Sequence, residues 1–308
     1  MTSIAHTLAG LDLAPPQAYL NLAVYPLFTR DDVLPGYLTL DEALATGAAH
    51  IFEVSESGSV PELQFINGST GSILLVDGEE LVGARQNRIL NLSLLIGAGQ
   101  TVVIPVSCVE RGRWSYRGRD FGSAQRSLYA NARAAKMRDV STHMRERGSR
   151  ASDQGRVWAD IERKQEALRV DSPTEAMADM FEARGKDIGG YETAFTAAPH
   201  QVGAVFAING TVRGADVFDS AATFAKFLRK LVGSYALDAV EEHEAWAAQV
   251  STLAHVKAFL AQLQHAPETR YKALAEGEDV RLESPSAAAG ALQVDGRTVH
   301  LAAFAVEA

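Results

Sequence analysis

Short apolar segments follow one another closely between residues 18 and 120, and this spacing constrains the fold more than any other feature. The segments are rich in β-branched and aromatic residues and are separated by Gly, Pro, Asn or Asp, which is typical of β-strands. Parallel strands would need crossovers of a dozen or more residues. We therefore predict an antiparallel meander or barrel-like sheet with one short helix at 38–47. The expected strands are 18–28, 50–54, 62–66, 72–77, 81–84, 89–97 and 101–110.

The middle of the chain changes to a helical period. Apolar residues recur at helical spacing over 130–144 and 157–168. A capping box at 172–175 predicts a further helix that ends at Gly185. The polar stretch 147–155 predicts a mobile loop between helices.

Strand-like segments return in the last third of the chain. Residues 200–218 and 280–306 read as strands, and helices are expected from Asp219 or Ser220 and over 244–264. The fold class is therefore α+β: an antiparallel β-rich sheet or barrel-like core, a helical middle, and C-terminal strands that complete it. We predict one intertwined unit over residues 1–308, which is β-rich over 18–120, helical over 121–190 and mixed over 200–308.

Four Asn-Gly or Asp-Gly pairs follow apolar residues. They lie within 66–68, 76–78, 208–210 and 294–296. Such pairs supply the positive φ angles of tight hairpins, so each one predicts a hairpin turn.

Composition excludes several classes of protein. The chain has 308 residues, of which 47% are hydrophobic and 22% are charged, as in an ordinary globular protein. Cys108 is the only cysteine, which excludes an intrachain disulfide and a cysteine-based zinc site. No apolar run is long enough to span a bilayer. Residues 1–9 lack the pattern of a signal peptide, so we expect a cytoplasmic location and no membrane partner.

Positive charge is concentrated within an acidic chain. The formal net charge is −9, yet residues 111–150 hold 11 Lys and Arg against 3 Asp and Glu. This basic segment could contact phosphates, or it could be a solvated helix face. The overall negative charge opposes polyanions, so we do not expect nucleic-acid binding.

The densest polar cluster is DGEELVGARQNR, at 77–88. Gly83 and Ala84 leave room beside the backbone, and Arg85 could bind a phosphate bidentately while Gln86 and Asn87 contact ribose or base edges. The alternative is an exposed hairpin with paired surface groups, in which Arg85 pairs with Glu79 or Glu110.

A second cluster lies at 107–114. Cys108 could be a nucleophile or a small core residue. Glu110 and Arg113 could form an ion pair, and Trp114 could stack on a base or close the core. We find no metal-binding motif, phosphate-binding loop, dinucleotide fingerprint or hydrolase elbow, and we predict no metal site and no cofactor.

The run LLVDGEELVGARQNRILNLSLLIGAGQTVVIPVSCVERGRW, at 74–114, resembles the ADP-ribosylglycohydrolase and rhodanese-phosphatase superfamily-associated proteins. QVGAVFAINGTVRGADVF and the C-terminal residues 277–304 are similar to the same family. The family's name records an association with enzymes of ADP-ribose and NAD-derived chemistry. The resemblance therefore implies a small-molecule nucleotide ligand, and allows a protein partner, in a pathway of ADP-ribose metabolism.

The sequence leaves the type of activity open. Our first hypothesis is a binding protein for an ADP-ribose- or NAD-derived nucleotide, and its ligand-binding residues are Arg85, Gln86, Asn87, Arg113, Trp114 and Asp216. The alternative is a hydrolase in which Glu79 or Glu110 is a general acid or base on a glycosidic or phosphate bond. A third hypothesis, nucleic-acid binding through 111–150, is less well supported because of the net charge.

Overall fold

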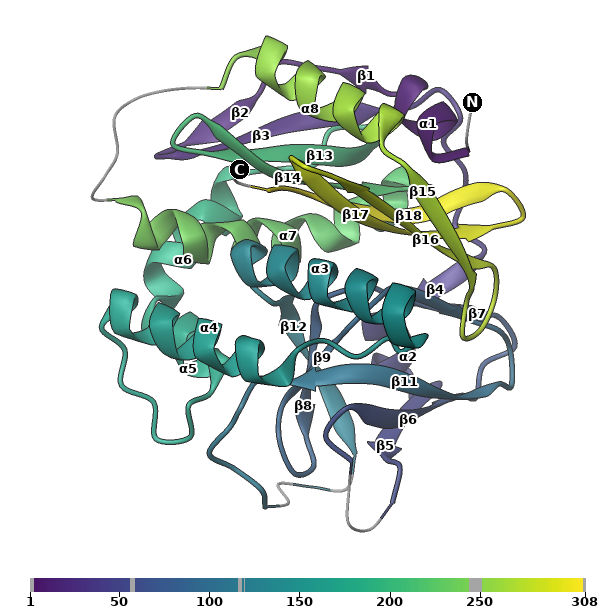
Figure 1. The fold of residues 1–308 in the computed structure, drawn as a ribbon, viewed down its shortest axis with the longest axis vertical. Coiled ribbons are helices and arrows are strands. Elements are labelled where there is room, and N and C mark those ends of the chain that lie inside the picture. The colour runs from purple at the N-terminus through teal and green to yellow at the C-terminus, as the bar shows by residue number, and fades with distance from the viewer. Residues whose placement is uncertain (1–2, 56–58, 116–117, 119, 244–250, 307–308) are drawn as a thin grey trace.

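The computed structural model describes residues 3–55, 59–115, 118, 120–243 and 251–306. The fold is α+β with mostly antiparallel sheets, as the sequence predicts. Figure 1 shows an upper β-layer formed by both ends of the chain, a lower β-layer formed by the segment between them, and helices in the middle.

The upper layer is a nine-stranded sheet in the order β1-β3-β13-β14-β18-β17-β16-β15, with β2 paired to β3. N-terminal strand β3 pairs with β13 in antiparallel register, so the C-terminal strands complete a sheet that the N-terminus begins. Its strands are β1 Asp12–Leu13, β2 Gln17–Tyr19, β3 Leu22–Phe28, β13 Gln201–Ile208, β14 Thr211–Phe218, β15 Glu268–Lys272, β16 Glu278–Ser284, β17 Ala287–Val294 and β18 Arg297–Ala305.

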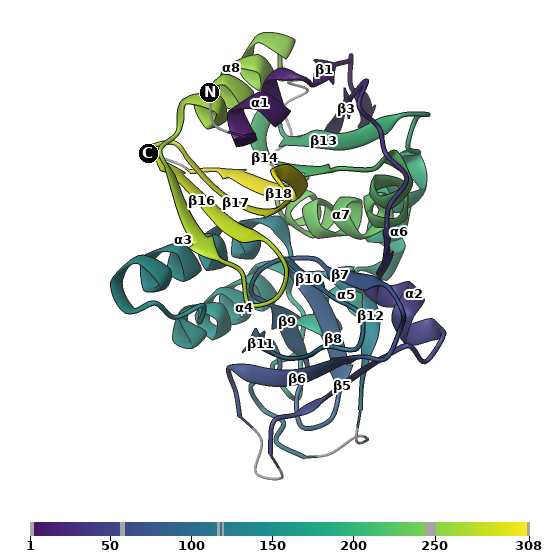
Figure 2. The ribbon, with the colours of Figure 1, turned by 90° about the vertical axis from the view of Figure 1, so that its right-hand side faces the viewer.

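The lower layer contains a six-stranded sheet in the order β12-β8-β9-β11-β6-β5. The sheet curls until its edge strands β12 and β5 are in contact, which gives the barrel-like shape in Figure 2. Strands β10, β7 and β4 form a smaller sheet beside it. The bounds are β4 Tyr37–Thr39, β5 Ala49–Glu53, β6 Glu62–Asn67, β7 Ser72–Leu75, β8 Glu79–Gly83, β9 Arg88–Leu90, β10 Leu94–Ile96, β11 Thr101–Cys108 and β12 Phe121–Ser127.

Helices cover both faces of the upper sheet. Apolar residues of α1 and α8 pack on the outer face, and α7 packs on the inner face, between the two layers (Figure 1). The helices are α1 Ser3–Ala9, α2 Leu40–Ala45, α3 Ala130–Arg147, α4 Gln154–Leu168, α5 Met177–Ala183, α6 Gly185–Ala194, α7 Ala221–Glu241 and α8 Leu253–His265. Within the described residues, no helix is both long and apolar enough to cross a membrane.

Two of the four predicted hairpins form. Asn209-Gly210 joins β13 to β14, and Asp295-Gly296 joins β17 to β18, in each case with two positive φ angles. The prediction is wrong at 76–78 and 66–68, because the strands on either side of each turn enter different sheets. Asp77 and Gly78 therefore connect two sheets and do not close a hairpin.

Three further predictions of secondary structure are wrong. Residues 122–127, expected to be helical, belong to edge strand β12, whose exposed face tolerates the polar sequence. The expected strand at 89–97 is divided between β9 and β10, in different sheets. The capping box fails because Glu175 has a φ of 50° and the helix begins only at Met177. That helix, α5, ends at Ala183, close to the predicted stop at Gly185, although Gly185 itself begins α6.

The remaining expectations concern loops and helix limits. Residues 148–153 form the predicted loop between α3 and α4, and its mobility remains a prediction. The helix expected over 244–264 begins at Leu253, and residues 244–250 lie outside the described part of the chain.

Candidate functional site

A cavity of about 390 Å³ lies among α2, β12, α6 and α7, and cationic side chains dominate its charged lining. We call it the basic cavity. Two carboxylates, Asp41 and Glu192, also line it. Its four cations are Arg126, Lys226, Arg229 and Lys230.

Lys230 is held at the inner wall by two carboxylates. Its Nζ lies 2.6 Å from Glu79 Oε1 and 2.6 Å from Asp41 Oδ2, and its side chain is only 5% exposed. Burial raises the pKa of Glu79, although Lys230 opposes the effect. Burial would lower the pKa of Lys230, but Glu79 and Asp41 outweigh it and raise that pKa. Lys230 is therefore a fixed cation at neutral pH.

Arg126 is held from behind in a similar way. Its Nε donates to Glu80 Oε2 at 2.6 Å, and its guanidinium lies over the ring of Phe181. The other carboxylate oxygen of Glu80 accepts a hydrogen bond from Asn87 Nδ2 at 3.2 Å. Burial raises the pKa of Glu80, and Arg126 opposes that effect. Adjacent residues of β8, Glu79 and Glu80, thus position the two innermost cations.

A second layer of polar groups fixes Asn87. Its backbone N–H donates to Glu110 Oε2 at 3.1 Å, and its Oδ1 accepts from Arg113 Nη2 at 3.2 Å. Arg113 also pairs with Glu110 at 2.7 Å. Burial acts to raise the pKa of Glu110, but the hydrogen bonds from Arg113 and Asn87 outweigh it and lower the pKa. Glu80, Asn87, Glu110 and Arg113 form one continuous chain, which we call the buried network.

Two guanidinium groups of the cavity have unused donors. Arg126 and Arg229 each bond a carboxylate through Nε, at 2.6 Å to Glu80 and 2.8 Å to Glu192. Their terminal nitrogens make no hydrogen bond to any described residue. A guanidinium that is anchored by Nε still presents a planar pair of donors, which suits a phosphate or carboxylate.

The structure places the predicted site residues in three different environments. Asn87, Glu110 and Arg113 lie inside the buried network, and Glu79 lies behind Lys230. Gln86 is also buried, and its Oε1 accepts hydrogen bonds from Arg88 and from the Cys108 thiol.

Arg85 and Trp114 lie at the surface of the lower layer. The Arg85 guanidinium is 5.3 Å from the centre of the Trp114 ring, and Trp114 is 45% exposed. The ring therefore does not close the core. Glu79 and Glu110 have Lys230 and Arg113 as their cationic partners, where the sequence suggested Arg85.

Cys108 is a buried thiol at the end of β11. Burial raises its pKa, and the nearby Arg88 only partly compensates. A raised thiol pKa disfavours the thiolate, which fits the core interpretation and disfavours a nucleophile.

Asp216 lies on β14 of the upper sheet and is not part of the buried network. Arg133 bonds both of its oxygens, at 2.6 and 3.1 Å, and neither side chain is exposed. Burial acts to raise the pKa of Asp216, but Arg133 and His300 outweigh it and lower the pKa.

The cations of the basic cavity are not among the predicted site residues. Arg126 lies in the segment that was misassigned as helix. Lys230 was detectable, because it follows Phe227 by three residues on the apolar stripe of α7, where a charged residue requires a buried partner.

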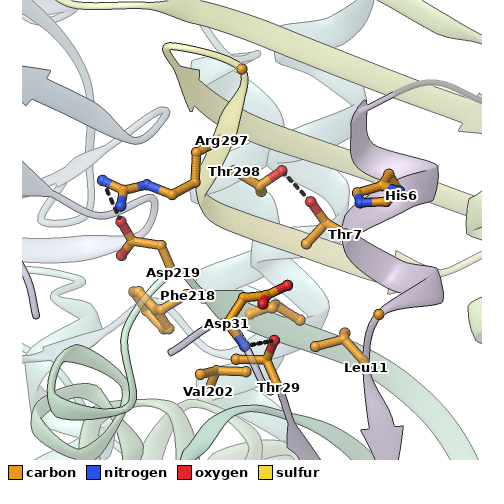
Figure 3. Close-up of a pocket in the computed structure, with 13 residues that line it drawn as sticks. His6, Thr7, Leu11, Thr29, Asp31, Val202, Phe218, Asp219, Arg297 and Thr298 are labelled. Carbon is orange, nitrogen blue, oxygen red and sulfur yellow. Dashed lines mark hydrogen bonds and ion pairs between the residues drawn. The ribbon is translucent and has the colours of Figure 1, made fainter. Parts of the chain in front are cut away.

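A second cavity of about 530 Å³ opens between α1, the end of β14 and the β17–β18 turn (Figure 3). Arg297 pairs with Asp219 at 3.3 Å, and Thr7 bonds Thr298 at 2.9 Å. The carboxylate of Asp31 also lines this cavity. Its single arginine is opposed by two carboxylates, so it is less suited to an anion than the basic cavity.

A sequence profile of the ARG and Rhodanese-Phosphatase-superfamily-associated Protein domain matches residues 10–304. The match spans nearly the whole chain and is to the family that the motifs at 74–114 resemble. The comparisons with curated proteins and with solved structures found no match.

Proposed function

Because the chain belongs to the family of ARG and Rhodanese-Phosphatase-superfamily-associated proteins, we propose that it binds an ADP-ribose- or NAD-derived nucleotide in the basic cavity. The observation that carries this proposal is the pair of anchored arginines, Arg126 and Arg229, with unused terminal donors. The association with ADP-ribosylglycohydrolases in the family's name supports a ligand of ADP-ribose metabolism.

The cavity offers complementary groups for both parts of such a ligand. Arg126 and Arg229 supply planar donors for a diphosphate, and Lys230 adds a fixed positive charge. Asp41 also lines the cavity, and its carboxylate can accept a hydrogen bond from a ribose hydroxyl. A volume of about 390 Å³ is within the usual range for small-molecule sites.

Calorimetric titration with ADP-ribose, NAD, AMP and adenosine tests the proposal. We expect binding of the phosphate-bearing compounds and none of adenosine. Arg126→Lys removes the planar fork but keeps the charge, and should weaken binding by about 10- to 150-fold, the equivalent of roughly 1.5–3 kcal/mol. Arg145→Lys is the matched control, because Arg145 forms an exposed ion pair with Glu283 outside the cavity. Absence of binding to the parent protein would refute the proposal.

The Arg85–Trp114 surface is the alternative location for the same ligand. An exposed indole can stack on a base, and Arg85 can contact a phosphate. Arg85→Lys separates the two locations. If the ligand binds in the basic cavity, this variant binds like the parent protein. If only Arg85→Lys loses affinity, the ligand binds beside Trp114.

Hydrolysis of the bound ligand is a second candidate function, and the environment of Glu79 favours it. A carboxyl group with a raised pKa can act as a general acid, and Glu79 lies directly behind Lys230, which would have to relay its proton into the cavity. Glu110 has a lowered pKa and lies in the buried network, so it is less suited to proton donation. Chromatography of ADP-ribose and NAD after incubation should then show products that Glu79→Gln abolishes. If ADP-ribose and NAD are both recovered unchanged, the hydrolase proposal is wrong and the binding proposal alone remains.

A further inference from the structure

Three residues from separate parts of the sequence lie in a row between the two β-layers. Ser93 lies in the loop between β9 and β10, His300 on β18 and Asp216 on β14. Ser93 Oγ is 2.8 Å from His300 Nδ1, and His300 Nε2 is 3.4 Å from Asp216 Oδ1. This row shares no residue with the lining of the basic cavity.

The directions of these hydrogen bonds follow from the chemistry of the partners. The pKa of Asp216 is low because Arg133 and His300 outweigh the effect of burial, so its carboxylate only accepts. His300 Nε2 faces this carboxylate, which favours the tautomer with the proton on Nε2, and Nδ1 of that neutral ring is an acceptor. The backbone N–H of Asp77 donates to Ser93 Oγ at 3.0 Å, which leaves the Ser93 proton directed to His300.

The hydroxyl, imidazole and carboxylate follow one another in the same order as in enzymes that use a serine nucleophile with a histidine base. The hydroxyl donates to the imidazole, and Nε2 of the imidazole lies 3.4 Å from a buried carboxylate that can stabilise its protonated form. Asp216 is fixed by two bonds from Arg133, and His300 is 1% exposed, so the orientation of the ring is set. Ser93 is only partly buried.

Ser93 lines a small cavity whose lining also includes a cationic side chain. Arg281 borders it together with Asp77 and Asp279, and among the described residues the Arg281 Nη1 group has only the thioether sulfur of Met137 as its acceptor. That donor is available for a developing oxyanion. The cavity volume is about 10 Å³, enough for one water molecule. An acyl group must therefore displace the flexible Met137 side chain, which packs against Gly290 at the cavity wall.

We propose that Ser93 is a nucleophile for small carboxylic esters, with His300 as its base and Asp216 as a positioning residue. Ser93 Oγ attacks the ester carbonyl carbon while its proton passes to His300 Nδ1. The carbon–oxygen bond to the alcohol breaks, and His300 returns the proton to the departing alkoxide. Water then attacks the acyl-serine and gives one proton to His300. The bond between the acyl carbon and Ser93 Oγ breaks, the carboxylic acid leaves, and His300 returns its proton to Ser93 Oγ.

Labelling with methanesulfonyl fluoride, followed by peptide mass spectrometry, tests the proposal on the full chain. We expect sulfonylation of Ser93, with fluoride as the leaving group. His300→Gln should slow it by at least about 100-fold, the contribution of a general base. Met137→Ala should accelerate it by widening the entrance. The rate of p-nitrophenyl acetate hydrolysis should likewise be lower in His300→Gln and higher in Met137→Ala than in the parent. Ser93→Ala should abolish it.

The controls distinguish a loss of reactivity at Ser93 from a failure to fold and from a blocked cavity entrance. Ser107→Ala is the matched variant, because Ser107 is a buried serine that bonds Asn91 and Ser152 but no histidine, and it should label like the parent. The thermal melting of each variant shows whether it is folded. If folded parent and folded Met137→Ala both leave Ser93 unlabelled, or if His300→Gln labels as fast as the parent, the proposal is wrong.

Discussion

Arg113 shows how a single buried cation supports the candidate site. Its side chain is 4% exposed, and it bonds Glu110, Asn87 and the carbonyl oxygen of Ala84. Arg113→Met would leave the carboxylate of Glu110 buried without its cation, which costs about 3–5 kcal/mol. We expect a loss of that size in the free energy of unfolding, measured by urea denaturation at pH 7.

The matched control is an arginine in an exposed ion pair. Arg163 pairs with Asp160 at 3.2 Å, and its side chain is 65% exposed. Arg163→Met should therefore cost less than about 1 kcal/mol. Equal losses in the two variants would show that Arg113 contributes no more than a surface residue.

The pH dependence of stability gives an independent measure of Glu110. Its pKa is lowered in the folded protein from an ordinary value of 4.5. The stability that it contributes is therefore fully present above pH 4.5 and is lost as the pH falls through the lower folded pKa. We expect the parent to be more stable than Glu110→Gln at pH 7, and the difference to shrink below pH 4.5. A difference that does not change with pH would contradict this linkage.

Among the secondary-structure elements, the pairing of β8 with β12 depends on Gly83. Its φ is 143°, and a Cβ atom there would lie 2.4 Å from the carbonyl oxygen of Asp120. The room beside Gly83 is thus occupied by the neighbouring chain segment, where the sequence suggested a ligand. Gly83→Ala should destabilise the fold by roughly 1–3 kcal/mol through the backbone conformation alone, and by more through the clash.

Gly122 on β12 is the control for that substitution. It pairs with Val82, one residue before Gly83, and a Cβ atom would meet nothing within 4 Å. Gly122→Ala should be neutral or stabilise the protein by up to about 1 kcal/mol in thermal denaturation. A comparable loss in both variants would mean that removing any glycine from this strand pair is harmful.

The sequence predicts elements well where local chemistry determines them. The turns at Asn209 and Asp295 form because both neighbouring strands continue in one sheet. At Asp77 the same local signal precedes a change of sheet, which no local pattern reveals. Polar strand β12 was missed because its backbone pairing with β8, and not apolar periodicity, defines it.

The candidate site was predictable only in part for the same reason. The motif at 77–88 contains the carboxylates Glu79 and Glu80 and the network residue Asn87. Their cationic partners, Arg126 and Lys230, are 46 and 151 residues away in the chain. Such pairs depend on how the layers pack, so the sequence identified the supporting groups and missed the cations that line the cavity.

Across the whole molecule, helix α3 joins the two β-layers through buried charges. Arg133 bonds Asp216 of the upper sheet, and Lys136 bonds Asp77 of the lower layer. Both cations come from the basic segment 111–150, as does the buried Arg113. Three of the eleven cations in that segment are therefore internal, so fewer of them can face a nucleic acid or form a solvated helix face than the sequence suggests.

The one-unit organisation leads to a prediction about fragments of the chain. Strand β3 pairs with β13, and the central apolar cluster combines Leu22 and Leu74 with residues of α7. A fragment 1–120 retains most of the lower apolar cluster but lacks β12, β13 and the cations of α3. In this fragment Glu80 of β8 would be buried without its partner Arg126, which lies on the missing β12. The apolar strand β3 would have an exposed edge, because its neighbour β13 is missing.

We therefore expect the fragment to show no cooperative transition in differential scanning calorimetry, while the full chain melts in one. Cleavage of the full chain in the loop 148–153 should leave the two pieces associated on gel filtration, because α3 and α4 each retain contacts with the rest of the protein. A fragment 1–120 that melts cooperatively would instead identify the lower β-layer as a separate domain. The buried ion pairs of α3 would then be contacts between domains.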